Sequence, residues 1–377
     1  MPDPIPTYRK FVYALAVLMI VFGGLELILR AEDFNFYFNF SADLLGMPLL
    51  DLSRFRRVAN QTVEFDPQVF WKFKPDQILD ARDIYRKPVR INHFGFRGKD
   101  FPLEKKAGTF RIVCLGDSVT FGWSGADEET YPAQLESILQ KNHPDRAVEV
   151  INLGVTGYTS FQGKELFLAW AEKLKPDLVI FGFGQNDRLP ALASDRELYD
   201  SRAWQKSRID LALSHCQIYQ LVKAGVIYCQ QRQQGLSLDP KTYLPRLKRK
   251  VSPEEYEKNF GEIKKVCDRL GCKMILLNVD FPGLPMDPAT ESLEKLAKES
   301  QAQLPANWRE WDSLQLNREI SSEFGIKMID LRTIFDDFSG REGIELMIDN
   351  GHPNEQGHRL IAELLAISIE AEQIPDE

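Results

Sequence analysis

Cysteine is scarce in this 377-residue sequence, and the few that occur do not form a metal-binding or disulfide pattern. The five cysteines stand at positions 114, 216, 229, 267 and 272. Cys267 and Cys272 flank the end of an expected helix, and their spacing differs from the C-x-x-C pairs of zinc sites. A disulfide between Cys216 and Cys229 stays an open alternative. We otherwise expect most of the cysteines to be small, buried apolar residues.

An excess of positive charge is also missing. The chain has 47 Lys and Arg against 55 Asp and Glu, which gives a net charge of −8. Proteins that bind nucleic acid through its phosphates are normally basic, so we expect no nucleic-acid partner. Internal repeats and long low-complexity tracts are absent as well. The hydrophobic share of 44% and the charged share of 27% predict an ordinary globular protein, long enough for a large core and an extension.

One long apolar run does occur, from Phe11 to Leu29, with Glu26 as its only charge. Its length suits a membrane-spanning helix better than a core helix. Arg9 and Lys10 precede it, and a positive pair before the span predicts that the N-terminus stays in the cytoplasm. We therefore expect a single-pass anchor in the cytoplasmic membrane, with Glu26 near the interface and the rest of the chain periplasmic or extracellular.

Two other interpretations of this run stay open. A cleaved signal peptide needs small residues at its cleavage site, and the sequence LILRAED after the apolar core is a poor site. A buried helix of a soluble protein is the third interpretation. The anchor interpretation divides the chain into a cytoplasmic tip and transmembrane helix over 1–30, an N-terminal extension over 31–105 and a main domain over 106–377.

Strands alternate with helices in the main domain. Short apolar runs typical of buried strands lie at 110–116, 147–154, 177–184, 273–279 and 326–331. Helical patterns lie at 131–141, 161–173, 253–270 and 313–324. Ser252 is a cap at the start of the third of these helices, and Gly271 follows its end. This alternation predicts an α/β fold with a parallel sheet that is covered on both faces.

Two regions fall outside this alternation. In the extension, residues 69–77 and 89–101 alternate like the strands of a small hairpin or cover. From about 188 to 252 the main domain inserts a charged, mainly helical segment that ends in RLKRK. We expect this basic run to be a solvated face, with contact to anionic lipid or glycan as the alternative. The insert itself is a lid, a partner surface or a membrane contact.

Polar residues follow the predicted strands at their carboxyl ends. Ser118 follows the first strand, Gly157 the second and Asn186 the third. Asp349 and His352 come after the fifth strand and a loop. Because ligands bind at this edge of an open parallel sheet, we expect these side chains to meet.

These residue types fit nucleophilic catalysis. A serine hydroxyl attacks well only when a base takes its proton, and His352 can serve as that base. Asp349, three residues earlier, would orient the imidazole and stabilise its charged form. The backbone N–H groups of Ser118 and Gly157, with the Asn186 amide, would hold an oxyanion, and each such donor is worth about 10²–10³-fold in rate.

The four blocks GDSVT, NLGVTG, GQND and DNGHP resemble those of the SGNH hydrolases, also called GDSL-like lipases and esterases, over residues 110–369. This resemblance implies a three-layer α/β/α sandwich with a five-stranded parallel sheet. It also implies the absence of a metal and of an organic cofactor. The family's catalytic positions fall on Ser118, Asp349 and His352, and its oxyanion positions on Ser118, Gly157 and Asn186, with Gly154 as the alternative glycine.

The segment INHFGFRG, residues 91–98, is similar to the extension of membrane-anchored bacterial SGNH proteins that accompany polysaccharide or envelope acylation. This likeness implies an acylated glycan or lipid as substrate. One expected function is an esterase that removes acyl groups, above all acetyl groups, from such a substrate. An O-acyltransferase that works beside a membrane protein delivering acyl groups to an extracytoplasmic polysaccharide is the first alternative. A non-catalytic envelope scaffold is the second.

Several residues near these blocks have simpler interpretations. We expect Asp117 to cap the helix after Ser118, and Asp187 to order the loop of Asn186. We expect aromatic neighbours of the serine to pack rather than to bind an acyl chain, and other histidines to be structural or exposed. The residues concerned are Phe121, Trp123, His93, His143, His215 and His358.

Overall fold

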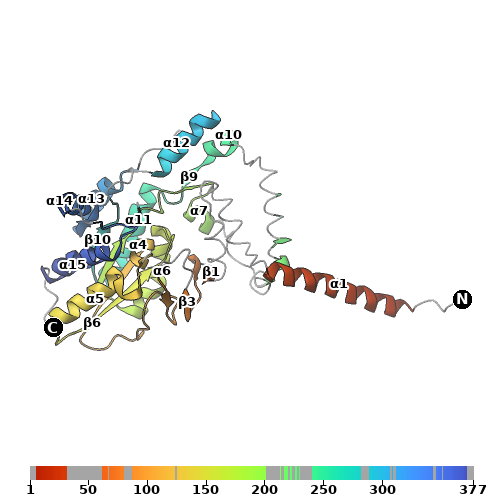
Figure 1. Ribbon diagram of the computed structural model, residues 1–377, viewed down its shortest axis with the longest axis horizontal. Helices are drawn as coiled ribbons and strands as arrows, with labels where there is room; N and C mark the ends of the chain where they lie inside the picture. Colours follow the sequence, from red (N-terminus) through yellow and green to blue (C-terminus); the bar gives the residue numbers. More distant parts are fainter. Residues whose placement is uncertain are drawn as a thin grey trace.

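The computed structural model places the main domain as a layered body, from which one long helix projects (Figure 1). It describes residues 6–31, 62–66, 68–79, 87–123, 125–200, 240–281, 288–305, 308, 311–342, 345–349 and 351–371, with single residues and short stretches between 213 and 229.

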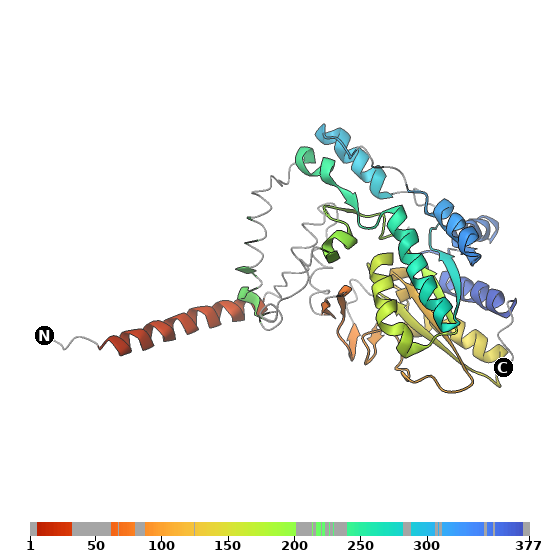
Figure 2. The ribbon, with the colours of Figure 1, turned by 180° about the vertical axis from the view of Figure 1, so that it is seen from behind.

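A five-stranded parallel sheet lies at the centre of the body (Figure 2). Its strands are β5 (Thr109–Gly116), β6 (Ala147–Gly154), β7 (Leu178–Gly182), β10 (Lys273–Asn278) and β11 (Lys327–Asp330). Their order across the sheet is β11-β10-β7-β5-β6, which confirms the predicted parallel sheet. From β5 the chain first adds β6 on one side of it and then β7 on its other side. The strand order reverses there, so β5 and β7 flank a topological switch point.

Helices cover both faces of the sheet and complete the predicted three layers. Along β5, Val113 and Leu115 enter one apolar core, while Ile112 and Cys114 enter the other. This alternation follows from the two-residue repeat of a strand that is buried on both sides. The first core lies under α6 (Ser160–Leu174), α11 (Pro253–Leu270) and α13 (Ser313–Phe324); the second lies under α5 (Tyr131–Asn142), α14 (Leu331–Glu342) and α15 (Glu355–Ala371).

The predicted caps of α11 are present. The Ser252 hydroxyl accepts a hydrogen bond from the Glu255 N–H, and Gly271 ends the helix at a φ of +70°. Glycine adopts this left-handed conformation without the steric cost that a Cβ would add. Two further helices, α12 (Pro288–Ser300) and α14, were not predicted from the sequence pattern.

The extension forms two antiparallel hairpins rather than one. One pairs β1 (Val63–Asp66) with β2 (Phe70–Phe73), and the other pairs β3 (Gln77–Leu79) with β4 (Val89–Ile91). The predicted strand 69–77 thus contains two strands with different partners. Apolar side chains of both hairpins, including Phe73 and Ile91, are buried in the same core as α6 and α11, and so is Phe96, which follows β4.

The insert is described only in part. Its two ends come together as β8 (Pro190–Ala191) and β9 (Lys248–Arg249), which pair antiparallel. Two short helices, α7 (Asp195–Asp200) and α10 (Pro240–Tyr243), lie between them along the chain. Most of the predicted helical segment falls outside the described residues, and the open question of lid, partner surface or membrane contact stays a prediction.

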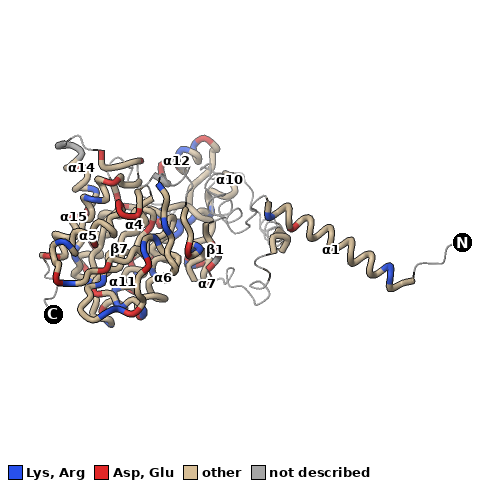
Figure 3. Tube along the Cα trace, turned by 60° about the horizontal axis from the view of Figure 1, so that its bottom comes forward, with Lys and Arg blue, Asp and Glu red and all other residues tan. Residues whose placement is uncertain are grey.

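Helix α1 (Thr7–Ala31) projects from the body with its charged residues near its two ends (Figure 3). None of its residues is buried, which contradicts the alternative of a buried core helix. Among the described residues it is the one helix long and apolar enough to cross a membrane, a property that it shares with signal sequences.

Candidate active site

Ser118 lies two residues after the end of strand β5, as the first residue of the short helix α4 (Ser118–Phe121). The predicted cap is present, because the Asp117 carboxylate accepts a hydrogen bond of 2.9 Å from the Val119 N–H. Gly116 is required for this tight turn: a Cβ there would lie 1.9 Å from Thr120 Oγ1. The turn places the serine at the switch point of the sheet, with 8% of its surface exposed.

The structure brings Ser118, His352 and Asp349 together in one hydrogen-bonded chain. His352 Nε2 lies 2.9 Å from Ser118 Oγ. On the other side of the ring, His352 Nδ1 lies 2.9 Å and 3.0 Å from the two carboxylate oxygens of Asp349. This arrangement fixes the tautomer in which Nδ1 carries a proton and Nε2 can accept one.

The loop that carries the histidine is itself held by local contacts. Asp349 Oδ1 accepts hydrogen bonds from the backbone N–H groups of Gly351 (2.8 Å) and His352 (2.9 Å). Asn354 caps α15, accepting a hydrogen bond of 3.0 Å from the Gly357 N–H. Partial burial raises the pKa of Asp349, but the hydrogen bond and charge of His352 and the two N–H groups outweigh it, and the pKa falls to about 2.

The predicted oxyanion residues lie at the ends of the neighbouring strands. Gly157 has a φ of +82°, which favours glycine. Within the described part of the chain, the backbone N–H groups of Ser118 and Gly157 meet no hydrogen-bond acceptor. Asn186 Nδ2 donates to the Tyr158 carbonyl at 3.0 Å and to Asp117 Oδ2 at 3.4 Å, so its amide lies between the residues next to Gly157 and Ser118.

The alternative glycine, Gly154, has a different role. A Cβ at this position would lie 2.3 Å from the Phe121 backbone nitrogen and 2.7 Å from the Thr120 carbonyl carbon. Gly154 therefore lets β6 pack closely against α4. Its N–H also donates to Asn152 Oδ1 at 2.8 Å, so it is already paired.

Two buried carboxylates, those of Asp187 and Asp117, lie next in sequence to Asn186 and Ser118. The Asp187 carboxylate accepts a hydrogen bond of 2.9 Å from the Ser160 N–H, and thereby ties the loop of Asn186 to the start of α6. Burial raises the pKa of Asp187 to about 7, although the Ser160 hydrogen bonds lower it. Burial likewise raises the pKa of Asp117 to about 6, although the Val119 N–H and the charge of His352 lower it.

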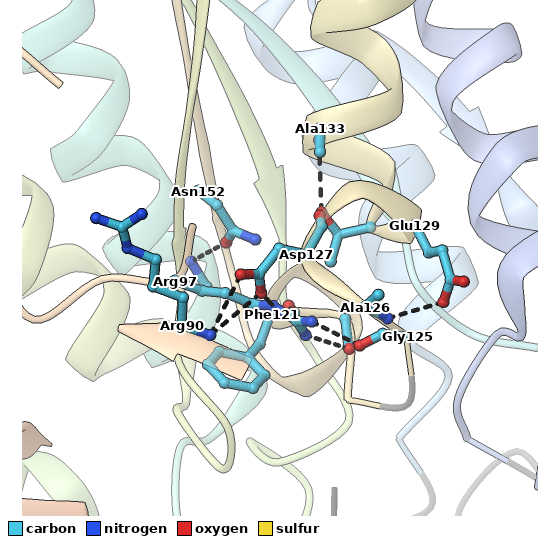
Figure 4. A network of polar contacts seen from close by, with 12 residues as sticks. Arg90, Arg97, Phe121, Gly125, Ala126, Asp127, Glu129, Ala133 and Asn152 are labelled. Atoms are coloured by element: carbon cyan, nitrogen blue, oxygen red, sulfur yellow. Dashed lines mark hydrogen bonds and ion pairs between the residues drawn. The ribbon is translucent and has the colours of Figure 1, made fainter. Parts of the chain in front are cut away.

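Arg97 is a residue that the sequence analysis missed. Its guanidinium, 1% exposed, donates to the carbonyl oxygens of Phe121, Gly122 and Gly125 and pairs with Asp127 at 3.0 Å (Figure 4). The first of these carbonyls belongs to the last residue of α4, and the other two belong to the loop that follows the helix. The extension thus fixes the backbone directly after the serine helix, and only the motif INHFGFRG carried a sequence signal for it.

The aromatic residues near the serine divide into two kinds. Phe121 is fully buried and stacks on Phe73 at 5.2 Å, as predicted for a packing residue. Trp123 is half-buried, and its ring lies against the imidazole of His352, with centroids 5.8 Å apart and planes at 26°. Trp123 therefore borders the site directly.

The remaining histidines and the cysteines lie apart from this constellation. His358 is buried beside Tyr131, and burial lowers its pKa to about 3. His93 and His143 contact surface carboxylates of Asp76 and Glu370, while His215 is outside the described residues. All five cysteines are free, so the alternative of a Cys216–Cys229 disulfide is wrong, and three of the five are buried.

Comparisons with known proteins agree with the resemblance in the four blocks. An acetylxylan esterase of Xylanibacter ruminicola is 24% identical over 280 residues, which cover 72% of this chain and 45% of that protein. The chain thus spans less than half the length of this curated relative.

Solved structures with a similar arrangement include the acetyl xylan esterase AlAXEase, with a TM-score of 0.41 and 15% identity over 69% of this chain and 100% of that one. Another is LAE5, an alpha/beta hydrolase enzyme from the metagenome of Lake Arreo in Spain. It has a TM-score of 0.40 and 22% identity over 71% of this chain and 97% of that one.

A model of the GDSL-like lipase/acylhydrolase family matches residues 114–360. This segment begins within the strand that leads to Ser118, includes Asn186 and His352, and ends within α15. It covers more than half of the sequence, and the chain therefore belongs to the GDSL-like lipase/acylhydrolase family, the SGNH hydrolases.

Proposed function

We propose that this protein is a serine esterase that removes acetyl groups from an acylated carbohydrate of the cell envelope. The observation that carries the proposal is the hydrogen-bonded chain from Ser118 Oγ through His352 to Asp349. A scaffold that had kept only the fold would not need a nearly buried serine aligned with a base and its orienting carboxylate.

In the first half of the proposed reaction, Ser118 Oγ attacks the ester carbonyl carbon while His352 Nε2 takes the hydroxyl proton. Asp349 stabilises the resulting imidazolium. The tetrahedral intermediate then collapses: the bond to the sugar oxygen breaks, and His352 returns the proton to that oxygen. The products are a free sugar hydroxyl and an acetyl-Ser118 ester.

In the second half, water attacks the acetyl-Ser118 carbonyl, and His352 takes one of its protons. Collapse of this second intermediate breaks the bond to Ser118 Oγ, which receives the proton back. Acetate leaves, and the free serine is restored. An acyltransferase would differ only in the acceptor, a sugar hydroxyl in place of water.

The oxyanion of both intermediates would be held by the unpaired N–H groups of Ser118 and Gly157 and by Asn186 Nδ2. The contact of Nδ2 with Asp117 Oδ2, at 3.4 Å, is the longer of its two hydrogen bonds, so it is the one that a developing oxyanion would replace. The two backbone donors are preorganised, so they act without rearrangement at the moment of reaction.

Helix α1 supports the proposed anchor in the cytoplasmic membrane. It is apolar over a length that spans a bilayer, and none of its residues is buried. Near its C-terminal end, Glu26 accepts hydrogen bonds of 3.0 Å from the backbone N–H groups of Gln217 and Ile218 in the insert. This contact would place part of the insert at the outer face of the cytoplasmic membrane, with the catalytic domain outside the cytoplasm.

The test uses the full-length protein in detergent with acetylated xylooligosaccharides and p-nitrophenyl acetate. We expect acetate release from both, and loss of both activities in Ser118→Ala at an unchanged thermal unfolding temperature. Acetyl transfer to an added unacetylated oligosaccharide, with little free acetate, would instead show an acyltransferase. Equal activity of Ser118→Ala and wild type would disprove the proposal.

A further inference from the structure

The N-terminal extension brings a tryptophan next to the proposed oxyanion glycine. A Cβ built on Gly157 would lie 3.7 Å from Trp71 Cζ2, so the indole edge is in van der Waals contact range of that position. The indole also packs edge-on against Tyr158, with ring centroids 5.4 Å apart and planes at 81°. Trp71 comes from β2, far before the serine in sequence, and no family block contains it.

The backbone around Trp71 is held in place by several contacts. Asp66 Oδ1 accepts hydrogen bonds from the N–H groups of Gln68 and Val69, at 2.9 Å and 3.2 Å. Gln162 Nε2, from α6, donates to the Val69 carbonyl at 2.9 Å. The Tyr158 hydroxyl donates to the carbonyl of Trp71 itself. Tyr158, the residue after Gly157, and Gln162 at the start of α6 therefore hold the backbone at and before Trp71.

Phe70, the residue before Trp71, has a φ of +70°, a conformation that is uncommon for a bulky side chain. Its ring is buried and stacks on Phe161 at 6.1 Å and 13°. Such backbone strain persists where the surroundings determine it, and it concentrates at functional sites. Here it turns the chain so that Phe70 enters the core while Trp71 borders the site.

Partial exposure separates Trp71 from its core neighbours. Phe70 and Phe73, on either side of it, are 5% and 3% exposed, whereas Trp71 is only half-buried. Trp123, stacked on His352, is half-buried too. Two indoles therefore border the reacting groups, one at the oxyanion glycine and one at the histidine. A flat aromatic surface with a polar N–H suits the C–H face and hydroxyls of a sugar ring.

We propose that Trp71 and Trp123 form a carbohydrate subsite, in which a pyranose ring lies against the Trp71 indole so that its ester carbonyl reaches Ser118. This inference rests on the proposed function, because it names how that site recognises the carbohydrate part of its substrate. Trp71 is then a specificity-determining residue. Small aryl esters, which lack the sugar, gain little from it.

The first experiment compares two substrates in the same preparations. We expect Trp71→Ala to lower kcat/KM for acetylated xylooligosaccharides about tenfold or more, mainly through KM, as for the loss of one aromatic contact. Hydrolysis of p-nitrophenyl acetate, which lacks the sugar, should fall several-fold less than hydrolysis of the oligosaccharide, and Trp71→Phe should recover part of the loss. Trp170→Ala is the matched control, since Trp170 lies in the last two turns of α6 and packs against Phe94 and Phe96 of the extension.

A binding measurement on variants without Ser118 tests the sugar subsite independently of ester cleavage. Acetylated xylooligosaccharide is titrated calorimetrically into Ser118→Ala and into Ser118→Ala/Trp71→Ala, and only the first should bind. An equal loss on both substrates, or equal binding by both variants, would overturn the subsite. So would a wild type that binds no oligosaccharide while it cleaves p-nitrophenyl acetate through Ser118. Failure of the esterase proposal would look different, because the wild type would then show no Ser118-dependent cleavage of either substrate.

Discussion

His352 Nε2 lies 2.9 Å from Ser118 Oγ, although 234 residues separate the two along the chain. Ser118 follows strand β5, which is adjacent to the central strand of the sheet, and His352 precedes helix α15. Their contact is therefore a product of the whole fold, and we propose that the two side chains act as a single unit.

Residues that act as a unit show non-additive effects on rate. We expect Ser118→Ala and His352→Ala each to lower kcat by about 10³–10⁶-fold, and the double variant to be no slower than the worse single one. The measurement is steady-state hydrolysis of p-nitrophenyl acetate. Losses that multiply in the double variant would show that the two side chains act independently.

Asp349 should stay ionised wherever the enzyme works, because its pKa is lowered to about 2. Asp349→Asn removes the charge that stabilises the imidazolium, and we expect kcat to fall about 10²–10⁴-fold. Since wild-type Asp349 does not titrate above about pH 3, the ratio of the two rates should show no step from its ionisation between pH 4 and pH 8. A step in that ratio near pH 4, where a free carboxylate titrates, would contradict this pairing.

Asp187 should make stability fall as the pH rises. Burial raises its pKa from 3.8 to about 7 in the folded state, helped by Asp195 and Asp117, so between these values the folded chain holds a proton that the unfolded chain has released. Asp187→Asn carries no charge and should gain stability relative to wild type between pH 5 and pH 8, measured by thermal unfolding. The exposed Asp100→Asn serves as control. A difference that is constant with pH would refute this assignment.

The Arg97 network should matter for stability rather than for chemistry. Arg97→Met leaves Asp127 and three loop carbonyls without their buried donor, and we expect a loss of about 3–5 kcal/mol in the free energy of unfolding. Arg90→Met, whose exposed side chain pairs only with Asp100 among the described residues, should cost less than about 1 kcal/mol. Similar losses in the two variants, measured by chemical denaturation, would contradict the network.

Removal of helix α1, the proposed anchor, should separate two roles of the N-terminal region. A protein that begins at Glu32 keeps both hairpins of the extension and should cleave p-nitrophenyl acetate as the full chain does. A protein that begins near residue 106 loses Phe73 and Phe96 from the core and should not fold stably. A well-folded, active protein from the shorter chain would show that the extension is a separate domain.

The sheet was predictable because its strands are buried on both faces and so read as short apolar runs, such as FRIVCLG. The positions of Ser118 and His352 were predictable because polar residues at the carboxyl ends of parallel strands meet at one edge. Helix limits followed from caps such as Ser252, whose hydrogen bond is local.

The pairing of the extension was not predictable in the same way. Residues 69–77 alternate as strands do, but alternation does not name a partner, and Phe70 interrupts the pattern with a positive φ that local preference disfavours. The positions of Trp71 and Arg97 depend on contacts with α6 and with the loop after α4, far along the chain. Tertiary packing decides such features, and a single sequence carries little signal for them.

In the proposed reaction, Ser118 carries the acyl group. A pre-steady-state assay with p-nitrophenyl acetate, on wild type and Ser118→Ala, measures this most directly. We predict a burst of about one equivalent of p-nitrophenol in the wild type, followed by turnover, with both lost in Ser118→Ala. Acid quench during turnover should yield protein heavier by one acetyl group, located on Ser118. A burst that persists in Ser118→Ala, or an acetyl group found elsewhere, would contradict the account.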